Sequence, residues 1–351
     1  MRAARRKAER KAPAARPARG PTPAPAQPLF LFLAEPGLGD LALHELKHLK
    51  LTQRKARPLK ARLRNHDMLV LPGHLVEPSR ARSRLCTNVL RAPIFGRGAV
   101  TPRQLDALAA LCRRGGYKRI VSTVTGEAFA RQDLLRWLTR ELAARGVTLA
   151  ASGRALWLIV VDAAFYLAEE IQNHHDAPGR GAASTRSGAL PATIGAAMAF
   201  AAQLGEGEVV WDPVAGSGGL LAEVGALAPG ARLLATDIDP AAVAALGGRF
   251  GPRAWCEIAD AAGVALPGPP LTLTIANLPF GKRYAAQGGT TAFYADVIAN
   301  ALRHAGPGWR GVFLTSDTNA MRTAARGLSL TAIADLKIRG LPAAIWKVER
   351  P

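Results

Sequence analysis

The stretch 271–284, LTLTIANLPFGKRY, constrains the fold of this chain more than any other part of the sequence. Its first six residues have the β-branched and apolar content of a buried parallel strand. The strand must stop within Asn-Leu-Pro-Phe at 277–280, because Pro279 has no N–H with which to continue a central strand. We therefore predict an α/β fold that carries these four residues at the carboxyl end of a sheet, where such folds bind ligands.

The four residues at this turn have complementary chemistry. The side chain of Asn277 and the carbonyl of Leu278 can both accept hydrogen bonds from a planar amine. Pro279 makes the turn rigid, and Phe280 offers a ring on which another ring can stack. The turn therefore predicts a site that holds a nucleobase or another flat group with an amine.

Upstream of this turn, three further strands end in polar or glycine residues. EVVWDPVAGSGGLLAEVGAL, at 208–227, predicts a strand, a glycine-rich turn and a helix, and ARLLATDIDP and WCEIADAAG predict two more strands. In a parallel sheet the carboxyl ends of such strands lie along one edge, so we expect their end residues to form one site. These residues are Asp212, Gly216, Gly218, Asp237 and Asp260.

The pattern of glycines favours an adenosine ligand without phosphates. A dinucleotide fingerprint requires glycine at position 221, where this chain has Leu221, and the GK[ST] of a phosphate-binding loop is absent. Asp237 follows Asp212 by 25 residues, a spacing suited to two hydrogen bonds from ribose hydroxyls. S-adenosylmethionine fits this description, and a sheet of this kind without any ligand is the alternative.

The charge is concentrated in the N-terminal half. The 351 residues carry a formal net charge of +20, of which residues 1–28 contribute +7, residues 29–170 contribute +11 and residues 171–351 contribute +2. A solvated surface predicts an even spread, whereas a binding site for a polyanion predicts this concentration. We therefore expect the N-terminal half to bind nucleic acid.

The remaining composition indicates a cytoplasmic protein. Its three cysteines, Cys86, Cys112 and Cys256, are far apart and form no CxxC pair, which points to a reducing compartment without a disulfide framework or a zinc site. No apolar run reaches the length that crosses a membrane. We expect a monomer that binds neither metal nor membrane.

Two histidine patterns resemble metal sites. HELKH, at 44–48, matches the H-E-x-x-H zinc motif, but no third ligand follows at a suitable spacing. We interpret it as a solvated helix face. The adjacent His174 and His175 would point about 100° apart on a helix, so we assign them no role beyond possible RNA contact.

The sequence divides into five parts. The first is a basic tail of alanine, arginine, lysine and proline, whose composition is typical of disorder. Short strands and arginine-bearing helices follow, including a basic helix predicted over 78–90, and they indicate a small α+β region. The predicted parts are a disordered tail (1–28), a ferredoxin-like domain (29–114), an RNA-binding domain (115–172), a linker (173–188) and a catalytic domain (189–351).

These motifs resemble a known family. Residues 208–283 are similar to class I S-adenosylmethionine-dependent methyltransferases that carry the amine-methylating motif [DN]-x-P-[YF]. From about residue 29 onward the chain resembles the THUMP-domain guanine-N2 RNA methyltransferases, especially those that act on tRNA. The segments that carry this resemblance are PGLGDLALHEL, GYKRIVSTVTGEAF, GRALWLIVVD, ALPATIGAAM and LKIRGLPAAIWKVER.

The resemblance implies a role for each site residue. Asp212, Gly216 and Gly218 would line the methionine end of the cofactor, Asp237 would bind its ribose, and Asp260 would bind its adenine amine. The target guanine would be held by residues 277–280. By the same resemblance the chain is a tRNA (guanine-N2)-methyltransferase of the acceptor-stem type, with a Rossmann-like catalytic sheet and an N-terminal ferredoxin-like and THUMP region.

The chain departs from the family at two places. Gly219 stands where the family usually has a threonine, and the linker lacks the family's S-L-x-x-R-x-Y-R segment. Three other functions remain open. Two of them are other methyltransferases, because the same turn serves several amines, and the third has no activity. They are an rRNA guanine-N2 methyltransferase, a DNA adenine-N6 methyltransferase and an RNA-binding THUMP protein without activity.

Overall fold

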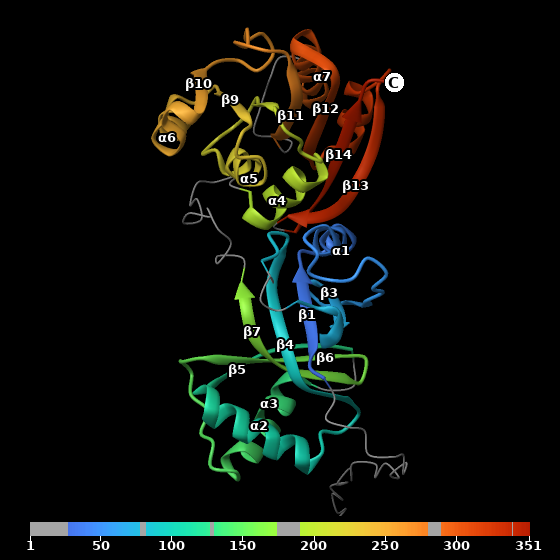
Figure 1. Cartoon of the computed structure of the whole chain (residues 1–351), viewed down its shortest axis with the longest axis vertical. Helices are drawn as coiled ribbons and strands as arrows, with labels where there is room; N and C mark the ends of the chain where they lie inside the picture. The colour runs from blue at the N-terminus through green and yellow to red at the C-terminus, as the bar shows by residue number, and fades with distance from the viewer. Residues whose placement is uncertain (1–26, 78–81, 127–129, 174–189, 280–288, 339) are drawn as a thin grey trace, which may run out of the picture.

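The computed structural model contains two mixed sheets, one above the other along the long axis of the molecule (Figure 1). It describes residues 27–77, 82–126, 130–173, 190–279, 289–338 and 340–351. Within these ranges each sheet has seven strands. The first sheet uses residues from the N-terminal half and the second uses residues from the C-terminal half, so the division expected from the charge pattern follows the division of the fold.

The first sheet has the strand order β2-β3-β1-β4-β7-β6-β5. All its neighbours are antiparallel except β5 and β6, which are parallel and joined through α3. Thr101 begins α2 with a capping box to Gln104, and Gly116 ends it in the left-handed conformation. Its elements are β1 (Leu29–Ala34), α1 (Gly39–His48), β2 (Leu59–Arg62), β3 (Asp67–Pro72), η1 (Gly73–Leu75), β4 (Cys86–Arg97), α2 (Pro102–Gly115), β5 (Arg119–Thr125), α3 (Arg131–Ala143), β6 (Ala155–Val161) and β7 (Ala164–Asn173).

The second sheet has the strand order β10-β9-β8-β11-β12-β14-β13. Strands β8 to β12 are parallel, and the order reverses beside β8, which creates the topological switch point at which α/β sheets bind ligands. The hairpin β13–β14 completes the sheet. Its elements are α4 (Ala192–Ala201), β8 (Val209–Asp212), α5 (Gly219–Leu227), β9 (Arg232–Asp237), α6 (Pro240–Phe250), η4 (Gly251–Arg253), β10 (Ala254–Ile258), β11 (Leu271–Asn277), α7 (Gly289–His304), β12 (Ala305–Thr315), α8 (Thr318–Ala324), β13 (Ser329–Ile338) and β14 (Leu341–Glu349).

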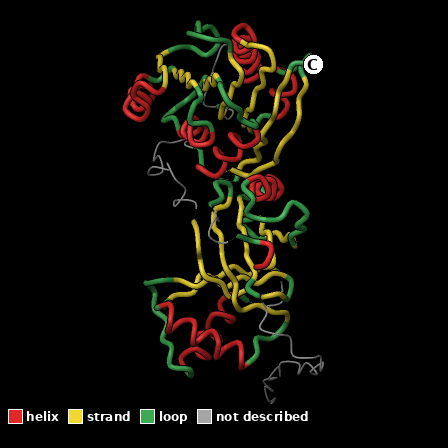
Figure 2. Tube along the Cα trace, in the orientation of Figure 1, coloured by secondary structure: helices red, strands yellow, loops and turns green. Residues whose placement is uncertain are grey.

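Helices cover both faces of the second sheet, as Figure 2 shows in red against yellow strands. Alternate strand residues such as Leu273 and Ile275 belong to a core shared with α4, α5 and α6, whereas Trp211 and Phe313 belong to a core shared with α7 and α8. Side chains of period two buried on both faces are what a doubly wound sheet requires. The prediction of a Rossmann-like sheet with an N-terminal α+β region is confirmed.

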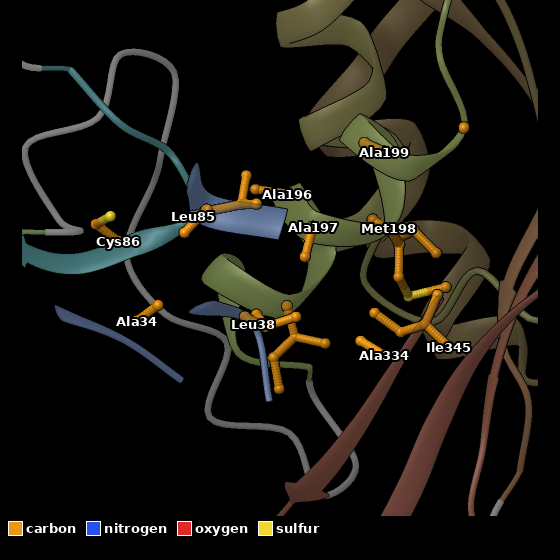
Figure 3. Packing of buried hydrophobic residues seen from close by; sticks show 14 of the residues in the cluster. Ala34, Leu38, Leu85, Cys86, Ala196, Ala197, Met198, Ala199, Ala334 and Ile345 are labelled. Carbon is orange, nitrogen blue, oxygen red and sulfur yellow. The ribbon is translucent and has the colours of Figure 1, made fainter. Parts of the chain in front are cut away.

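One hydrophobic cluster joins the two sheets (Figure 3). Leu38 and Leu85 from the first region lie in the same cluster as Met198 of α4 and Ile345 of β14. Gly37 approaches β13 so closely, with φ +99°, that a Cβ there would lie 1.8 Å from the carbonyl oxygen of Asp335. Burial of this kind holds the two regions in one orientation.

The predicted basic helix over 78–90 is wrong where the structure describes it. Residues 82–84 are irregular, and β4 begins at Cys86. The segment CTNVLRAPIF pairs with β1 and β7 on its two sides, and these pairings place it in the sheet. Arg84 is therefore part of the junction between the two regions and not of a basic helix face.

The domain boundary predicted at residue 114 stays a prediction. One continuous sheet includes strands from both sides of this position. The long strand β4 precedes it and pairs with β7, which follows it. Among the described residues, no helix is both long enough and apolar enough to span a membrane.

Candidate functional site

The carboxyl ends of the parallel strands bring the predicted site residues to one edge of the second sheet. β8 ends at Asp212, β9 ends at Asp237 and β11 ends at Asn277. β8 lies between β9 and β11 in the sheet. The three polar side chains thus come from three adjacent strands, as the sequence predicts.

The glycine-rich turn after β8 closes against the end of β9. The backbone N–H of Gly216 donates to a carboxylate oxygen of Asp237 at 2.8 Å, and the N–H of Ala215 donates to the carbonyl of Thr236 at 3.0 Å. Gly216 has φ +54°, a left-handed conformation that glycine adopts without strain, and a Cβ there would contact nothing within 4 Å. The turn therefore leaves open space beside Gly216, into which a ligand can come close to the backbone.

Asp212 is the most buried acid at this edge. Its side chain is 2% exposed, and it accepts a hydrogen bond from the backbone N–H of Val214 at 3.1 Å. Burial and, to a smaller extent, the nearby charge of Asp237 raise the pKa of Asp212 to about 8. A cation bound here would favour the ionised carboxylate and lower this pKa.

Gly218 begins α5 and has a packing role. It has φ +74°, and a Cβ there would lie 2.4 Å from the ring of Phe250 and 2.7 Å from Leu246. Glycine is thus required for α6 to pack against the start of α5. The structure connects Gly218 to the shape of the turn, and not to a direct contact at the open face.

The end of β10 places Asp260 near Asp237. The N–H of Ala259 donates to the carbonyl of Asp237 at 3.1 Å, while the carboxylate of Asp260 accepts from the N–H of Ala262 at 2.9 Å and remains exposed. Ile238, which follows Asp237, is 59% exposed. Sequence reasoning did not single out this apolar side chain, although its position directly after a strand-end acid could have indicated it.

Asn277 carries a hydrogen-bond acceptor without a protein partner. Its Oδ1 atom is buried and has no hydrogen-bond partner among the residues that the structure describes. A buried acceptor left in this state costs roughly 1–3 kcal/mol. A donor on a bound ligand would remove this cost.

The turn after Asn277 is held by one contact to the end of β12 and one contact to α7. The N–H of Leu278 donates to the carbonyl of Leu314 at 2.9 Å, and the hydroxyl of Tyr294 donates to the carbonyl of Pro279 at 2.9 Å. Tyr294 lies 15 residues beyond Pro279 on α7, so no local sequence pattern could have revealed the contact. Phe280 lies outside the described residues, and its predicted role stays a prediction.

The HELKH helix differs from the solvated face that we predicted. His44 and His48 are exposed, but Glu45 is 2% exposed and accepts hydrogen bonds from the hydroxyl of Ser83 and the N–H of Arg84. The correction concerns Glu45 alone: its carboxylate holds the chain that leads into β4. His174 and His175 lie outside the described residues.

Comparison with known proteins gives a clear answer for structure and none for sequence. No protein-family model matches the chain, and no curated protein matches it. TrmN from Thermus thermophilus is similar in structure, with a TM-score of 0.76 and 19% identity over 93% of this chain and 100% of that one.

Two further solved structures share the architecture. A predicted N6-adenine-specific DNA methylase from Listeria monocytogenes has a TM-score of 0.66 and 14% identity over 93% of this chain and 97% of that one. SMU.472, a putative methyltransferase complexed with SAH, has a TM-score of 0.66 and 12% identity over 93% of this chain and 99% of that one. The chain therefore has, along almost its whole length, the two-part fold of these methylases.

Proposed function

We propose that this chain is an S-adenosylmethionine-dependent methyltransferase that modifies the N2 amine of a guanine in RNA, with tRNA as the substrate. The observation that carries the proposal is the buried Oδ1 of Asn277, an acceptor without a partner among the described residues, one strand away from Asp212. An exocyclic amine supplies the hydrogen that this atom lacks.

The cofactor fits the residues at the ends of β8 and β9. Asp212 would hold the cationic methionine end, the open turn at Gly216 would admit it, and Asp237 would accept from the ribose hydroxyls. Ile238 offers apolar surface beside this acid, and Asp260 would accept from the adenine amine. When bound, S-adenosylmethionine supplies a methyl group on a sulfonium.

The turn at 277–280 would hold the target amine. The lone pair of an exocyclic amine is delocalised into its ring, so the nitrogen is a poor nucleophile until acceptors hold its hydrogens. Asn277 Oδ1 and the Leu278 carbonyl would accept these hydrogens and orient the nitrogen. Phe280 would stack on a base turned out of its helix. The nitrogen would lose its proton to solvent after the transfer, so no residue of the chain is proposed as a general base.

The N-terminal half would bind the RNA backbone. Between Thr52 and β3 the chain exposes six basic residues, of which four form no ion pair with any described residue. These four are Arg54, Lys55, Arg57 and Arg64. The segment reaches the site edge, because Arg62 lines a groove with Lys337 and with Ser316 and Thr318, which follow β12. Phosphate contacts of this kind position a nucleic acid without reading its sequence.

The domain assignments belong to this proposal. Residues 29–114 would form a ferredoxin-like domain, 115–172 a THUMP-like RNA-binding domain, 173–188 a linker and 189–351 the catalytic domain. The protein would act as a cytoplasmic monomer. Because the Listeria neighbour is described as a predicted N6-adenine-specific DNA methylase, DNA adenine is a second candidate substrate, and rRNA guanine is a third.

Nucleoside analysis tests the activity. The protein is incubated with labelled S-adenosylmethionine and separately with tRNA, rRNA and duplex DNA, and the labelled nucleoside is identified. N2-methylguanosine in the tRNA fraction is the expected product. Label in rRNA or on adenine would identify a different substrate from the one proposed. No label in any fraction would favour the alternative of an RNA-binding protein without activity.

Asn277→Ala tests the role of the acceptor. Turnover should fall by roughly 10² to 10³, the loss typical of one hydrogen bond made in the transition state. Calorimetric binding of S-adenosylmethionine should survive, because Asn277 does not belong to the cofactor site. Near-normal turnover would refute the assigned role.

Removal of residues 1–28 tests the basic tail. The tail carries eight lysines and arginines, and each phosphate contact it makes should contribute about 0.7–0.9 to the slope of log affinity against log salt. The truncated protein should therefore show a flatter slope in RNA binding. An unaltered slope would mean that the tail makes no such contacts.

A further inference from the structure

We propose that Tyr294 is a positioning residue for the turn at 277–280, holding its backbone through the carbonyl of Pro279. The inference rests on the proposed function. It assigns to a residue of α7, distant from the motif in sequence, the orientation of the atoms that would receive the target amine.

The hydroxyl of Tyr294 lies within a directed chain of hydrogen bonds. It is 2.9 Å from the carbonyl oxygen of Pro279 and 2.6 Å from Oγ1 of Thr315. A carbonyl can only accept, so the single hydroxyl hydrogen of Tyr294 goes to Pro279 and Thr315 must donate to Tyr294. The N–H of Asp317 in turn donates to Oγ1 of Thr315 at 2.9 Å. Every hydroxyl in the chain thus has one assigned direction.

These hydrogen bonds act on the one backbone dihedral angle of Pro279 that is free to change. The ring fixes φ near −65°, so ψ alone decides how the residues on either side of Pro279 are oriented. A hydrogen bond to its carbonyl holds that angle. The N–H of Leu278 donates to the carbonyl of Leu314, so both attachments of the turn lead to the last two residues of β12.

The surroundings of Tyr294 keep it a donor. Its side chain is 0% exposed, and burial raises its pKa to about 12, so the hydroxyl stays protonated over the working pH range of most enzymes. Asp317 caps α8 by accepting from the N–H of Ala320 at 2.9 Å, which fixes the far end of the chain. The support for the turn is thus rigid from the helix cap to the carbonyl.

Tyr294→Phe removes only the hydroxyl group and is the direct test of the positioning role. Loss of orientation should lower kcat about tenfold, because small misplacements of reacting groups are costly, while KM for RNA and the affinity for S-adenosylmethionine change less than twofold. Thr274→Val is the matched control. It removes a buried hydroxyl on β11 that accepts from Trp309 Nε1 at 3.0 Å, and it should lower stability without lowering kcat.

A second pair of variants covers the case in which Tyr294→Phe does not fold. Thr315→Val removes the donor that orients the tyrosine hydroxyl and should lower kcat severalfold, whereas Thr315→Ser keeps a hydroxyl and should retain wild-type kcat. A purely structural role predicts equal kcat for both Thr315 variants and would overturn the proposal.

Hydrogen exchange separates this proposal from the proposed function. The peptide containing Leu278 should exchange its amide hydrogens severalfold faster in Tyr294→Phe than in Thr274→Val, whether or not a substrate is known. Unchanged exchange would overturn the positioning role. If the wild type methylates no nucleic acid but the exchange difference is present, the proposed function fails and the positioning role stands.

Discussion

The junction between the two sheets and the carboxyl edge of the second sheet both bury polar side chains, but they treat them in opposite ways. At the junction, Glu45 accepts from backbone and hydroxyl donors, and Glu223 pairs with Arg84 at 2.8 Å. At the edge, burial raises the pKa of Asp212 to about 8, and Asn277 Oδ1 lacks a partner within the described ranges.

The difference separates polar groups whose partners lie within the fold from polar groups that a ligand would complete under the proposed function. A buried group that is fully paired specifies one arrangement of its neighbours. A buried group left without a partner costs stability, and a bound molecule that supplies the partner removes that cost. Substitution should therefore lower stability at the junction and lower binding at the edge, and three variants test this contrast.

Arg84→Met should have the largest effect. It leaves Glu223, whose side chain is 4% exposed, without its cation, and removal of one partner of a buried pair costs roughly 3–5 kcal/mol. The free energy of unfolding, measured by chemical denaturation, should fall by about this amount. The double variant Arg84→Met/Glu223→Leu should recover part of the loss, because it removes both members of the buried pair.

The matched control for Arg84→Met is the same substitution at an exposed pair. Arg136 and Asp133 on α3 have side chains 76% and 70% exposed, so Arg136→Met should cost at most about 0.5 kcal/mol. Equal losses for Arg84→Met and Arg136→Met would show that burial at the junction does not matter.

Asp237→Ala should have the next largest effect, on binding. A charged acceptor contributes roughly 1.5–3 kcal/mol per hydrogen bond, so calorimetry should show the affinity for S-adenosylmethionine falling at least about tenfold. Glu257→Ala, an exposed acid on the neighbouring strand β10, is the control and should leave the affinity unchanged. Unchanged affinity in Asp237→Ala would show that the cofactor does not bind at Asp237.

Asp212→Asn should change the pH dependence of stability, with a small effect at any pH near 4. The folded pKa of Asp212 is raised to about 8, far above the roughly 3.9 of an unfolded aspartate. The folded state thus binds the extra proton, and the stability of the wild type should fall as pH rises from about 4 to about 8.

The asparagine side chain of the variant carries no proton that titrates in this pH range. The variant's stability without cofactor should therefore rise relative to the wild type, by about 1 kcal/mol per pH unit in the middle of that window. Thermal unfolding between pH 5 and 9 measures the difference, with Asp296→Asn, an exposed acid on α7, as the control. Parallel curves for Asp212→Asn and the wild type would contradict the raised pKa.

Local patterns in the sequence were enough to predict the second sheet and the order of its strand ends. Buried parallel strands are continuous apolar runs, and each ends at a glycine, proline or acid, so Asp212, Asp237 and Asn277 could be assigned to one edge before the structure was known.

Contacts distant in sequence could not be predicted in this way. The first residues of β4 were assigned to a basic helix, because the segment before them is rich in arginine and the pairing of β4 with β1 and β7 has no local pattern. Glu45 was expected to be solvated, because its partners lie 38 and 39 residues away. Tyr294 was missed for the same reason, since its contact to Pro279 exists only once α7 has packed onto β11.

The position of β14 between β12 and β13 has a consequence for the order in which this chain folds. β13 is made before β14 but pairs with β14, so it cannot join the sheet until residues 341–349 have been synthesised. The loop at Gly37 packs against β13. The first region, although synthesised earlier, must therefore wait with its apolar surface uncovered, and the junction should be the last part of the molecule to close during synthesis.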